Sequence, residues 1–378
     1  MAKKLDELLK KQDVKADKLS RIAGICSRIQ KRFGKESVNF LGNSRPEPLP
    51  RIPTGSVMLD KITGGGYPEG RIIEIFGAES SGKTSVCYHA MAEFQKKYPD
   101  EYCAFVDEEG TFDPEYAAKV GVNINELITA QPESGENAFE MVQGLIQEGV
   151  KLVVVDSVAA MLPRDEAESE EYGNQGVALQ ARLLSQGLRK LNPFLNKYHA
   201  TLIFTNQTRT NIKVTYGDPS VSTGGRALRY YASIRLQLNA GQKVKETVGG
   251  QEIVRAVEIN ATTAKNKTAA PFQKAKFTIV FGLGIDNDAG VIDFAIANGI
   301  IVKKGGWFSY GGENIAQGIS NVRTYLEEHQ DVYDEIKKKI NDITAKENES
   351  IQINEQPDEE PDEDFDDESD DDTQVGEV

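Results

Sequence analysis

The chain has 378 residues, enough for roughly two or three domains, and a formal net charge of −15 at pH 7. Fourteen acidic and no basic residues lie between Glu355 and Val378, so the remainder of the chain is close to neutral, at −1. The three cysteines lack a CxxC spacing, the amino end has no apolar signal core, and no run of about 18 apolar residues occurs. These features argue against a disulfide-stapled or membrane-spanning protein and favour a cytoplasmic one. Three scattered histidines also argue against a zinc site.

The amino-terminal segment, residues 1–44, is expected to form a helical arm and a linker. Its first 40 residues carry eleven Lys and Arg against five Asp and Glu, and apolar residues recur from Leu5 to Ile29 at roughly helical spacing. Such an amphipathic helix needs a partner surface for its apolar face. The proline-rich stretch "GNSRPEPLPRIPTG" that follows predicts an extended linker.

Residues 45–286 are expected to form a large α/β core with a mostly parallel sheet. Short aliphatic runs alternate with helical stretches here, namely "RIIEIF", "CAFVDEE", "KLVVVDS" and "TLIFTNQ". Apolar runs separated by helices predict a parallel sheet that is covered on both faces. Two hairpin-like segments, "VRAVEINATTAKNK" and "KAKFTIVFG", continue this sheet.

A small α+β carboxy-terminal domain is expected over residues 287–346, followed by an acidic tail over residues 347–378. The small domain combines a helix around Phe294, a hairpin at "KKGGWFSYGG" and two further helices. The dense carboxylates of the tail repel one another, so we expect the tail to be disordered and to serve solubility or interactions.

A phosphate-binding loop is predicted at "GAESSGKT", which matches GxxxxGK[ST] between a predicted strand and a predicted helix. Glycines in this pattern let backbone N–H groups wrap phosphates, and the amino end of the helix adds its dipole. Lys83 is expected to pair with the β and γ phosphates, and the Thr84 hydroxyl to ligate Mg²⁺. The predicted binding residues for ATP in this segment are Gly77, Ala78, Glu79, Ser80, Ser81, Gly82, Lys83, Thr84 and Ser85.

Polar side chains end the other apolar runs. Asp156 closes "KLVVVD" and is expected to bind both the nucleotide and the Mg²⁺ shell. Glu108 and Glu109 follow "CAFVD", and Asn206 and Gln207 follow "TLIFT". The strand ends of a doubly wound sheet meet at one crevice. Because a carboxylate there can polarise an attacking water and an amide can sense the γ-phosphate, these groups together predict an ATPase.

Eight segments resemble, in the same order, those of bacterial RecA recombinases. They are "RIPTGSVMLD", "GAESSGKT", "CAFVDEEGTFDPEYA", "VVVDSVAAM", "IFTNQTR", "STGGRALRYYASIRL", "KNKTAAPF" and "GGWFSYGGENIAQG". The resemblance covers about residues 5–345, and the chain is identified as a member of this family or a close phage-borne homologue. It implies a RecA-like P-loop ATPase core, with residues 1–44 as a polymerisation arm.

The resemblance assigns catalytic roles by position. Glu109 matches the catalytic glutamate of the family, and Gln207 matches the glutamine that links the γ-phosphate to a DNA-binding loop. Lys265 and Lys267 match lysines that a neighbouring subunit inserts toward the γ-phosphate. Their spacing of two residues predicts that both lie on one face of a strand.

The nucleotide's base is expected to lie against Asp113 and Tyr116, which match residues that border the adenine in the family. Two positions depart from the family pattern. Gly110 follows the glutamate where relatives often have histidine, and Ala78 stands where proline is common. Neither change removes a functional group, although we expect Gly110 to loosen the loop that carries the catalytic glutamate.

The stretch 207–227 is expected to be a DNA-binding loop, because an uninterrupted loop of about twenty residues in a compact domain is usually functional. It matches the second DNA-binding loop of the family, in which Ile212 corresponds to a residue wedged between bases. The resemblance implies DNA contacts from Arg182, Ser185, Arg189, Arg209, Ile212, Lys213, Gly224, Gly225 and Arg226. The acidic segment 165–171 of the first loop is expected to face away from phosphate.

The leading hypothesis is an ATP- and Mg²⁺-dependent recombinase that forms helical filaments on single-stranded DNA and catalyses homologous pairing and strand exchange. Its implied partners are single- and double-stranded DNA and further copies of the chain, while a LexA-type repressor and single-strand-binding or loader proteins stay open. A hexameric helicase or packaging motor on the same fold is one alternative. A non-catalytic single-strand coating protein is another. The resemblance also implies that the acidic tail restrains duplex binding, with solubility as the alternative role.

Overall fold

The computed structural model describes residues 2–35, 37–38, 40, 49–167, 176–210, 220–222 and 225–352. The chain divides into two compact units, residues 1–50 and 51–378. The first unit is built on helix α1 (Ala2–Phe33), as its helical spacing predicts. Apolar side chains such as Ile25 and Ile29 stay exposed along this helix, as expected of a helix that needs a partner surface.

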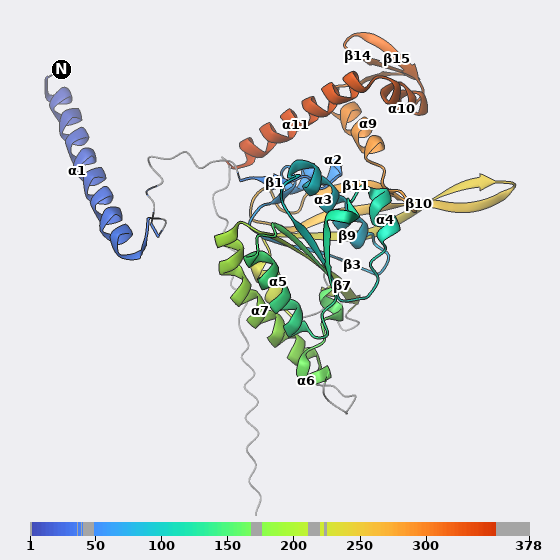
Figure 1. Cartoon of the computed structure of the whole chain (residues 1–378). Coiled ribbons are helices and arrows are strands. Elements are labelled where there is room, and N and C mark those ends of the chain that lie inside the picture. The colour runs from blue at the N-terminus through green and yellow to red at the C-terminus, as the bar shows by residue number, and fades with distance from the viewer. Residues whose placement is uncertain are drawn as a thin grey trace, which may run out of the picture. The chain divides into compact units, whose positions relative to one another are not determined.

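The second unit contains a large central sheet (Figure 1). Among the described residues it has ten strands, and nine of them follow the order β12-β11-β10-β9-β3-β7-β6-β4-β5. The parallel part comprises β3 (Ile72–Gly77), β7 (Thr201–Thr210), β6 (Leu152–Asp156), β4 (Cys103–Asp107) and β5 (Leu127–Ala130). The four predicted apolar runs therefore form parallel strands, and β5 is an edge strand that we did not anticipate.

The other half of the sheet is antiparallel. It comprises β9 (Ile234–Val248), β10 (Gln251–Asn266), β11 (Lys274–Val280) and β12 (Gly284–Ile285). The strand β9 joins the halves, because it runs parallel to β3 and antiparallel to β10. The long β9–β10 hairpin projects away from the rest of the sheet (Figure 1). The predicted hairpin segments thus continue the sheet.

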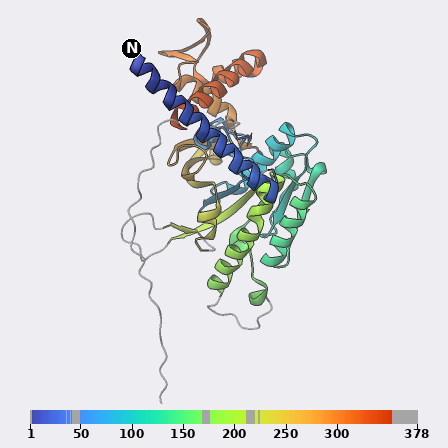
Figure 2. The same cartoon turned by 90° about the vertical axis from the view of Figure 1, so that its left-hand side faces the viewer.

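Helices cover both faces of the sheet, as the alternation of apolar runs and helices predicts (Figures 1 and 2). One face carries α2 (Val57–Thr63), α3 (Lys83–Lys97) and α4 (Pro114–Val120), and the other carries α5 (Gly135–Gln147) and α7 (Gly176–Tyr198). Figure 2 shows α5 and α7 lying side by side.

Successive side chains of the central strands supply the two apolar cores. In β3, Ile73 and Ile75 are buried in the core below α3, whereas Ile72 is buried in the core below α5 and α7. In β6, Val154 joins the first core and Val153 the second. Because neighbouring residues of a strand point to opposite faces, a strand covered on both sides is mostly apolar along its whole length, and Glu74 is the charged exception in β3.

Shorter elements complete the core. They are β1 (Arg51–Ile52), β2 (Tyr67–Pro68), η2 (Ile124–Glu126), η3 (Val158–Ala160), α6 (Arg164–Ala167), β8 (Ser220–Ser222) and α8 (Ala227–Tyr231). The pairing of β1 with β2 places the end of the predicted linker in a two-stranded sheet. Within the described ranges, no helix combines the length and the apolar character that a membrane crossing requires.

The helix that follows the phosphate loop is tied to the edge of the sheet by His89. Burial lowers the pKa of His89 to about 4, so the ring is neutral at pH 7. Its Nε2 atom accepts a hydrogen bond of 2.8 Å from the backbone N–H of Ile285 in β12. A Cβ atom at Gly284, where φ is 93°, would lie 2.4 Å from this nitrogen, so the close approach requires glycine.

The small domain begins at α9 (Asn287–Ala297) and has the predicted helix, hairpin and two helices. Its remaining elements are β13 (Val302–Lys304), β14 (Trp307–Tyr310), β15 (Glu313–Gln317), α10 (Ile319–Glu328) and α11 (Gln330–Gln352). The strand β15 extends the predicted hairpin to a three-stranded sheet. Helix α11 continues past residue 346, where the ordered domain was expected to end. Residues 353–378 of the acidic tail lie outside the described residues.

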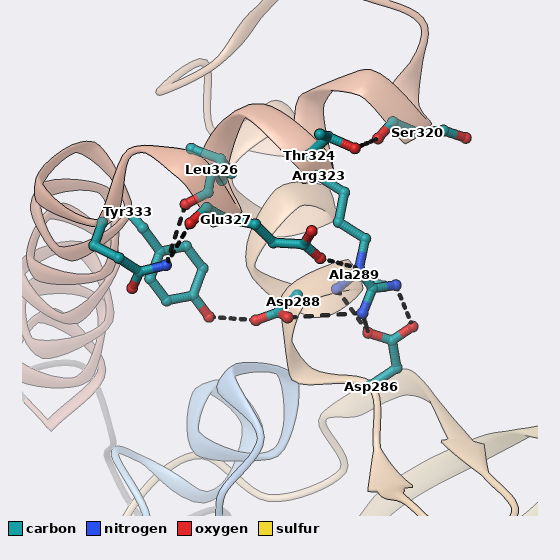
Figure 3. Close-up of polar contacts among 10 residues, drawn as sticks. Asp286, Asp288, Ala289, Ser320, Arg323, Thr324, Leu326, Glu327 and Tyr333 are labelled. Carbon is teal, nitrogen blue, oxygen red and sulfur yellow. Dashed lines mark hydrogen bonds and ion pairs between the residues drawn. The ribbon is translucent and has the colours of Figure 1, made fainter.

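A charged cluster joins the three helices of the small domain (Figure 3). Asp286 caps α9 by accepting from the N–H of Ala289 at 3.2 Å. Arg323 of α10 donates to both oxygens of Asp286, at 3.0 and 2.9 Å, and these bonds raise the pKa of Arg323. Tyr333 of α11 donates to Asp288 at 2.6 Å. Two-pronged pairing of this kind fixes orientation as well as distance.

Candidate active site

The phosphate loop has a backbone that only glycine permits at two of its positions. A Cβ atom at Gly77 would lie 2.2 Å from the carbonyl oxygen of Leu238, because β9 passes directly beside the strand end. Gly82 has φ 85°, in the left-handed region, and a Cβ there would lie 2.3 Å from Ile279. Gly82 is also the residue before α3, and none of the described side chains caps that helix end. The first N–H groups of α3 therefore face the loop, where they can bind an anion.

Lys83 and Ser81 show the chemistry that the loop can accept. The Lys83 ammonium donates to the carbonyl oxygens of Gly77 and Ala78, at 3.3 and 2.8 Å, and burial lowers its pKa. The Ser81 hydroxyl is buried and has no hydrogen-bond partner among the described residues. A positive charge, free N–H groups and an orphaned hydroxyl in one loop fit a polyphosphate.

A pair of oxygen donors lies at the end of β6. The Thr84 hydroxyl donates to Asp156 Oδ2 at 2.6 Å, and the Thr205 hydroxyl donates to Asp156 Oδ1. Burial raises the pKa of Asp156, while the two hydroxyl bonds oppose this shift. Carboxylate and hydroxyl oxygens are the ligands that Mg²⁺ prefers, so Thr84 and Asp156 fit the predicted metal site.

Glu109 lines the cavity that the phosphate loop borders and accepts hydrogen bonds from two side chains. Its Oε1 atom accepts from the Ser157 hydroxyl at 2.5 Å and from the Gln207 amide at 3.1 Å. The structure thus brings together Glu109 and Gln207, which are far apart in the sequence. The neighbouring Glu108 has a buried Oε1, and burial raises its pKa to about 7. Gly110 has φ 66°, so glycine suits the turn that follows Glu109.

The opposite wall of the site is held by the cap of α4. Asp113 accepts from the N–H of Tyr116 at 2.9 Å, and its own N–H donates to the Tyr88 hydroxyl at 3.2 Å. The Tyr116 hydroxyl donates to Ser85 at 2.8 Å, next to the phosphate loop. The Tyr88 and Tyr116 rings lie 5.7 Å apart. Asp113 and Tyr116 therefore stand together beside the loop, where a base is expected.

These groups surround a single cavity of about 530 Å³, a size typical of ligand sites. The predicted residues that line it are Glu79, Ser80, Ser81, Gly82, Lys83, Thr84, Ser85, Glu109, Asp113, Tyr116, Asp156 and Gln207. Six further lining residues were missed, namely Glu115, Lys119, Val257, Ile279, Phe281 and Gly282. Four of the six come from β10, β11 and the turn after β11, and no local motif marks them. Strand-end position was the one available signal, since Phe281 directly follows β11.

The structure places Lys265 and Lys267 outside this cavity. The Lys265 ammonium donates to the carbonyl oxygens of Arg229 and Tyr230 in α8, at 2.6 and 3.1 Å. Lys265 is the penultimate residue of β10, but Lys267 follows the end of that strand, and its N–H donates to Ser233 at 2.8 Å. The strand β10 thus ends one residue before Lys267, and the backbone bond to Ser233 continues its pairing with β9 by one position. Neither lysine serves the phosphate loop of its own chain.

Five of the nine residues predicted to bind DNA lie on, or directly before, two neighbouring helices, α7 and α8. Arg182, Ser185 and Arg189 are exposed on α7, at spacings that put them on one face. Gly225 packs against this helix, since a Cβ at Gly225 would lie 2.9 Å from Ala181. The next residue is the exposed Arg226 at the start of α8. Arg226 therefore directly follows a residue that packs against α7, the helix that carries Arg182.

The expected long loop is shorter than predicted at its ends. The strand β7 continues to Thr210, and Arg209 pairs with Val221 of β8 in an antiparallel hairpin. The β-branched composition of "QTRT" and "SVS" favours this extension. Ile212, Lys213 and Gly224 lie outside the described residues, as do residues 168–171 of the acidic first loop.

Comparison with known proteins agrees with this geometry. The model of the RecA N-terminal domain matches residues 20–286, and that of the RecA C-terminal domain matches residues 289–344. Protein RecA of Streptomyces coelicolor is 44% identical over 329 residues, which cover 86% of this chain and 85% of that protein. Protein RecA of Lactococcus lactis subsp. cremoris is 43% identical over 337 residues, covering 89% and 86%. Protein RecA of Picosynechococcus is 45% identical over 317 residues, covering 84% and 89%. This chain therefore belongs to the RecA family of recombinases.

Proposed function

We propose that the chain hydrolyses ATP with Mg²⁺ in a DNA-stimulated reaction and uses nucleotide binding to assemble on single-stranded DNA for homologous pairing and strand exchange. The observation that carries the proposal is the contact between Gln207 and Glu109. It joins a carboxylate suited to water activation to the strand that leads into the proposed DNA-binding hairpin. Binding of DNA and hydrolysis of ATP thus share one structural element.

Each side chain of the cavity has a defined task in this proposal. Lys83 and the N–H groups at the start of α3 hold the phosphates. Thr84 and Asp156 would hold Mg²⁺, and the ion would supply positive charge against the phosphates. Glu109, oriented by Ser157, accepts the proton of the attacking water. In these assignments the protein positions the reactants and neutralises charge, and it forms no covalent bond to the phosphate, as is usual for phosphoryl transfer.

Lys265 and Lys267 are proposed to act on the nucleotide of a neighbouring copy. Their own phosphate loop is already served by Lys83, and they lie outside the cavity of their own chain. An arrangement in which one face of a subunit completes the site on a different face of the next is heterologous. Such contacts generate rings or open helices. The family favours the open helix, that is, a filament.

The decisive experiment measures ATP turnover with and without single-stranded DNA and images the assemblies by electron microscopy. We expect turnover to rise when DNA is added and helical filaments to form with ATP. Closed six-membered rings would favour a helicase or packaging motor. Filaments without any turnover would favour a coating protein. A Lys83→Ala chain serves as the control for contaminating ATPase activity.

Further partners follow from family membership alone. We propose that a LexA-type repressor and single-strand-binding or loader proteins engage the filament, and that the chain works in the cytoplasm, where cellular DNA is found. Co-sedimentation of each candidate with DNA filaments formed in ATP tests this proposal. Recovery of none of them would restrict the partners to DNA and further copies of the chain.

A further inference from the structure

A buried ion pair crosses the centre of the sheet next to the active site. Glu74 of β3 is fully buried, and Arg235 of β9 is 9% exposed. Arg235 Nε donates to Glu74 Oε2 at 2.5 Å. The other carboxylate oxygen, Oε1, accepts from the side-chain amide of Asn206 in β7 at 2.9 Å. One carboxylate thus binds the strands on both sides of β3.

The two strands that Glu74 joins are the two stems of the proposed DNA-binding segment. The strand β7 leads into this segment, and β9 receives the chain again after β8 and α8. Glu74 therefore links the two ends of the segment that runs from Asn206 to Arg235. The next residue after Asn206 is Gln207, whose amide contacts Glu109. A shift in β7 is thereby a shift in the position of Gln207.

The same line of contacts reaches the lysine that is proposed to act on a neighbour. Arg235 lies opposite Lys265 in the register of β9 and β10. The guanidinium carbon of Arg235 also lies over the ring of Phe76, 4.4 Å from the ring centroid, which is a favourable cation–π distance. Asn206, Glu74, Arg235 and Lys265 therefore lie on four adjacent strands, β7, β3, β9 and β10.

A buried ion pair is a poor device for stability alone. Removing two charges from water costs free energy that their attraction offsets only in part, and well-packed apolar residues often stabilise a core equally well. A buried pair that is nevertheless present is better explained by the geometry it imposes. Here that geometry joins the DNA stems, the catalytic carboxylate and the lysine of the subunit interface.

We propose that Glu74 is a positioning residue that, paired with Arg235, transmits DNA binding to the hydrolytic site through Asn206 and β7. The inference rests on the proposed DNA-stimulated ATPase. In this inference, the buried pair of Glu74 and Arg235 couples the nucleotide cavity to the DNA-binding segment. Glu74 itself contacts neither nucleotide nor DNA in this proposal.

The test uses a double variant, Glu74→Gln/Arg235→Met, in the full chain. It removes both charges together, so no unpaired charge is left in the core, and the glutamine can still accept from Asn206. We expect the DNA-stimulated kcat to fall about tenfold or more, a typical size for coupling between sites. The DNA-free turnover, the KM for ATP and the thermal midpoint should stay close to those of the unaltered chain.

Two further variants separate positioning from general packing. Phe204→Leu changes a buried residue that lies opposite Glu74 on β7, and it should lower the thermal midpoint without changing the ratio of DNA-stimulated to DNA-free turnover. Arg235→Lys keeps a positive partner for Glu74 and should retain most of the DNA stimulation of ATP turnover. If the double variant is unfolded, Glu74→Gln/Arg235→Gln, which keeps a polar pair of similar size, gives the same readout.

The outcomes are distinct. Loss of stimulation at unchanged DNA-free turnover supports the inference. Full DNA stimulation of turnover in a folded double variant overturns the inference. The inference is also overturned if Phe204→Leu loses DNA stimulation to the extent that its thermal midpoint falls, because the loss would then reflect general destabilisation. Absence of DNA-stimulated turnover in the unaltered chain would overturn the proposed function itself, and the inference with it.

Discussion

Lys83 and Lys265 are both expected to neutralise phosphate, but they have different surroundings and different hydrogen-bond partners. Burial is the first cause of a lowered pKa at each of them. Lys83 points into the loop of its own cavity, where it binds the carbonyls of Gly77 and Ala78. Lys265 lies outside that cavity and binds carbonyls at the end of α8.

The region around Lys83 is a nearly complete nucleotide site, whereas the region around Lys265 lacks the anion that it is proposed to bind. Around Lys83, the loop, the metal ligands and the catalytic carboxylate converge within a single chain. Around Lys265, the positive charges of Lys267 and Arg235 add to the effect of burial and lower the pKa further, so the region is short of an anion. A triphosphate bound to a neighbouring copy would supply it. The following predictions test this contrast, from the largest expected effect to the smallest.

Lys83→Ala should reduce ATP turnover by at least about a thousandfold, because the phosphates lose their direct counter-ion in a partly desolvated site. Nucleotide binding and turnover are the measurements. Lys96→Ala, at the exposed far end of the same helix, is the matched control and should behave like the unaltered chain. Normal turnover in the Lys83 variant would contradict the whole active-site assignment.

Glu109→Gln should slow hydrolysis by roughly two to four orders of magnitude, because an amide cannot accept the proton of the attacking water. ATP binding and filament formation should persist, since the amide oxygen can still accept from Ser157 and Gln207. Single-turnover hydrolysis and a binding titration separate the two effects. Glu115→Gln, which also removes a carboxylate from the cavity lining, is the control. A Glu109→Gln chain that binds no ATP would show that Glu109 has a structural role.

A mixture of two inactive chains should regain activity if the lysines act on a neighbour. Lys265→Ala/Lys267→Ala chains keep an intact cavity, and Glu109→Gln chains keep both lysines. At equal amounts, about a quarter of the interfaces in a randomly mixed head-to-tail assembly pair the two intact halves. DNA-stimulated turnover should rise toward that fraction of the normal value. No recovery at any ratio, in filaments shown to be mixed, would rule out action across the interface.

Filament assembly should weaken as the pH rises above about 8, because Lys265 loses its charge. Burial, then Lys267 and Arg235, lower the pKa of Lys265 to about 8. Below pH 8 the free subunit already carries the charge that phosphate requires. Above it, engagement of a neighbour requires proton uptake, so the apparent affinity falls by up to about tenfold per pH unit. Filament assembly with ATP, measured by light scattering from pH 7 to 9.5, should show this decline.

Lys265→Arg is the matched variant for the pH series, because arginine stays charged throughout that range. Its assembly should be independent of pH between 7 and 9.5, whatever its absolute level. An equally steep decline in both chains would show that a different group titrates.

Removal of the acidic tail should have the smallest effect on hydrolysis and a selective effect on duplex DNA. Truncation after Asn354 removes fourteen negative charges and changes the net charge from −15 to −1. Duplex binding should tighten by about tenfold at low salt and low Mg²⁺, because the tail competes with phosphate for Lys303, Lys304 and other basic groups. Binding titrations across a salt series should show the gain shrinking as screening increases. Equal affinities throughout would leave solubility as the role of the tail.

Much of the core was readable from the sequence because its signals are local. The apolar run in β6 marks a strand that is covered on both faces, and the glycines of the phosphate loop mark a backbone that side chains would block. Asp156 and Glu109 were identified for a related reason, since parallel strand ends share one edge. The small domain was similarly predictable from its helix and hairpin patterns, apart from the strand β15.

The tertiary structure alone decided which distant segments complete these sites. Nothing in "VFGLG" shows that Phe281 lines the nucleotide cavity, because that depends on the antiparallel register of β10 and β11. Nothing near Glu74 shows that Asn206 and Arg235 flank it, since strand order across a sheet is set by which arrangement buries both faces at once. The spacing of Lys265 and Lys267 predicted a common strand face, but it did not show that β10 ends between them or that Lys265 binds carbonyls of α8. Local sequence determines backbone conformation and periodicity, whereas strand order and register follow from the packing of the whole core.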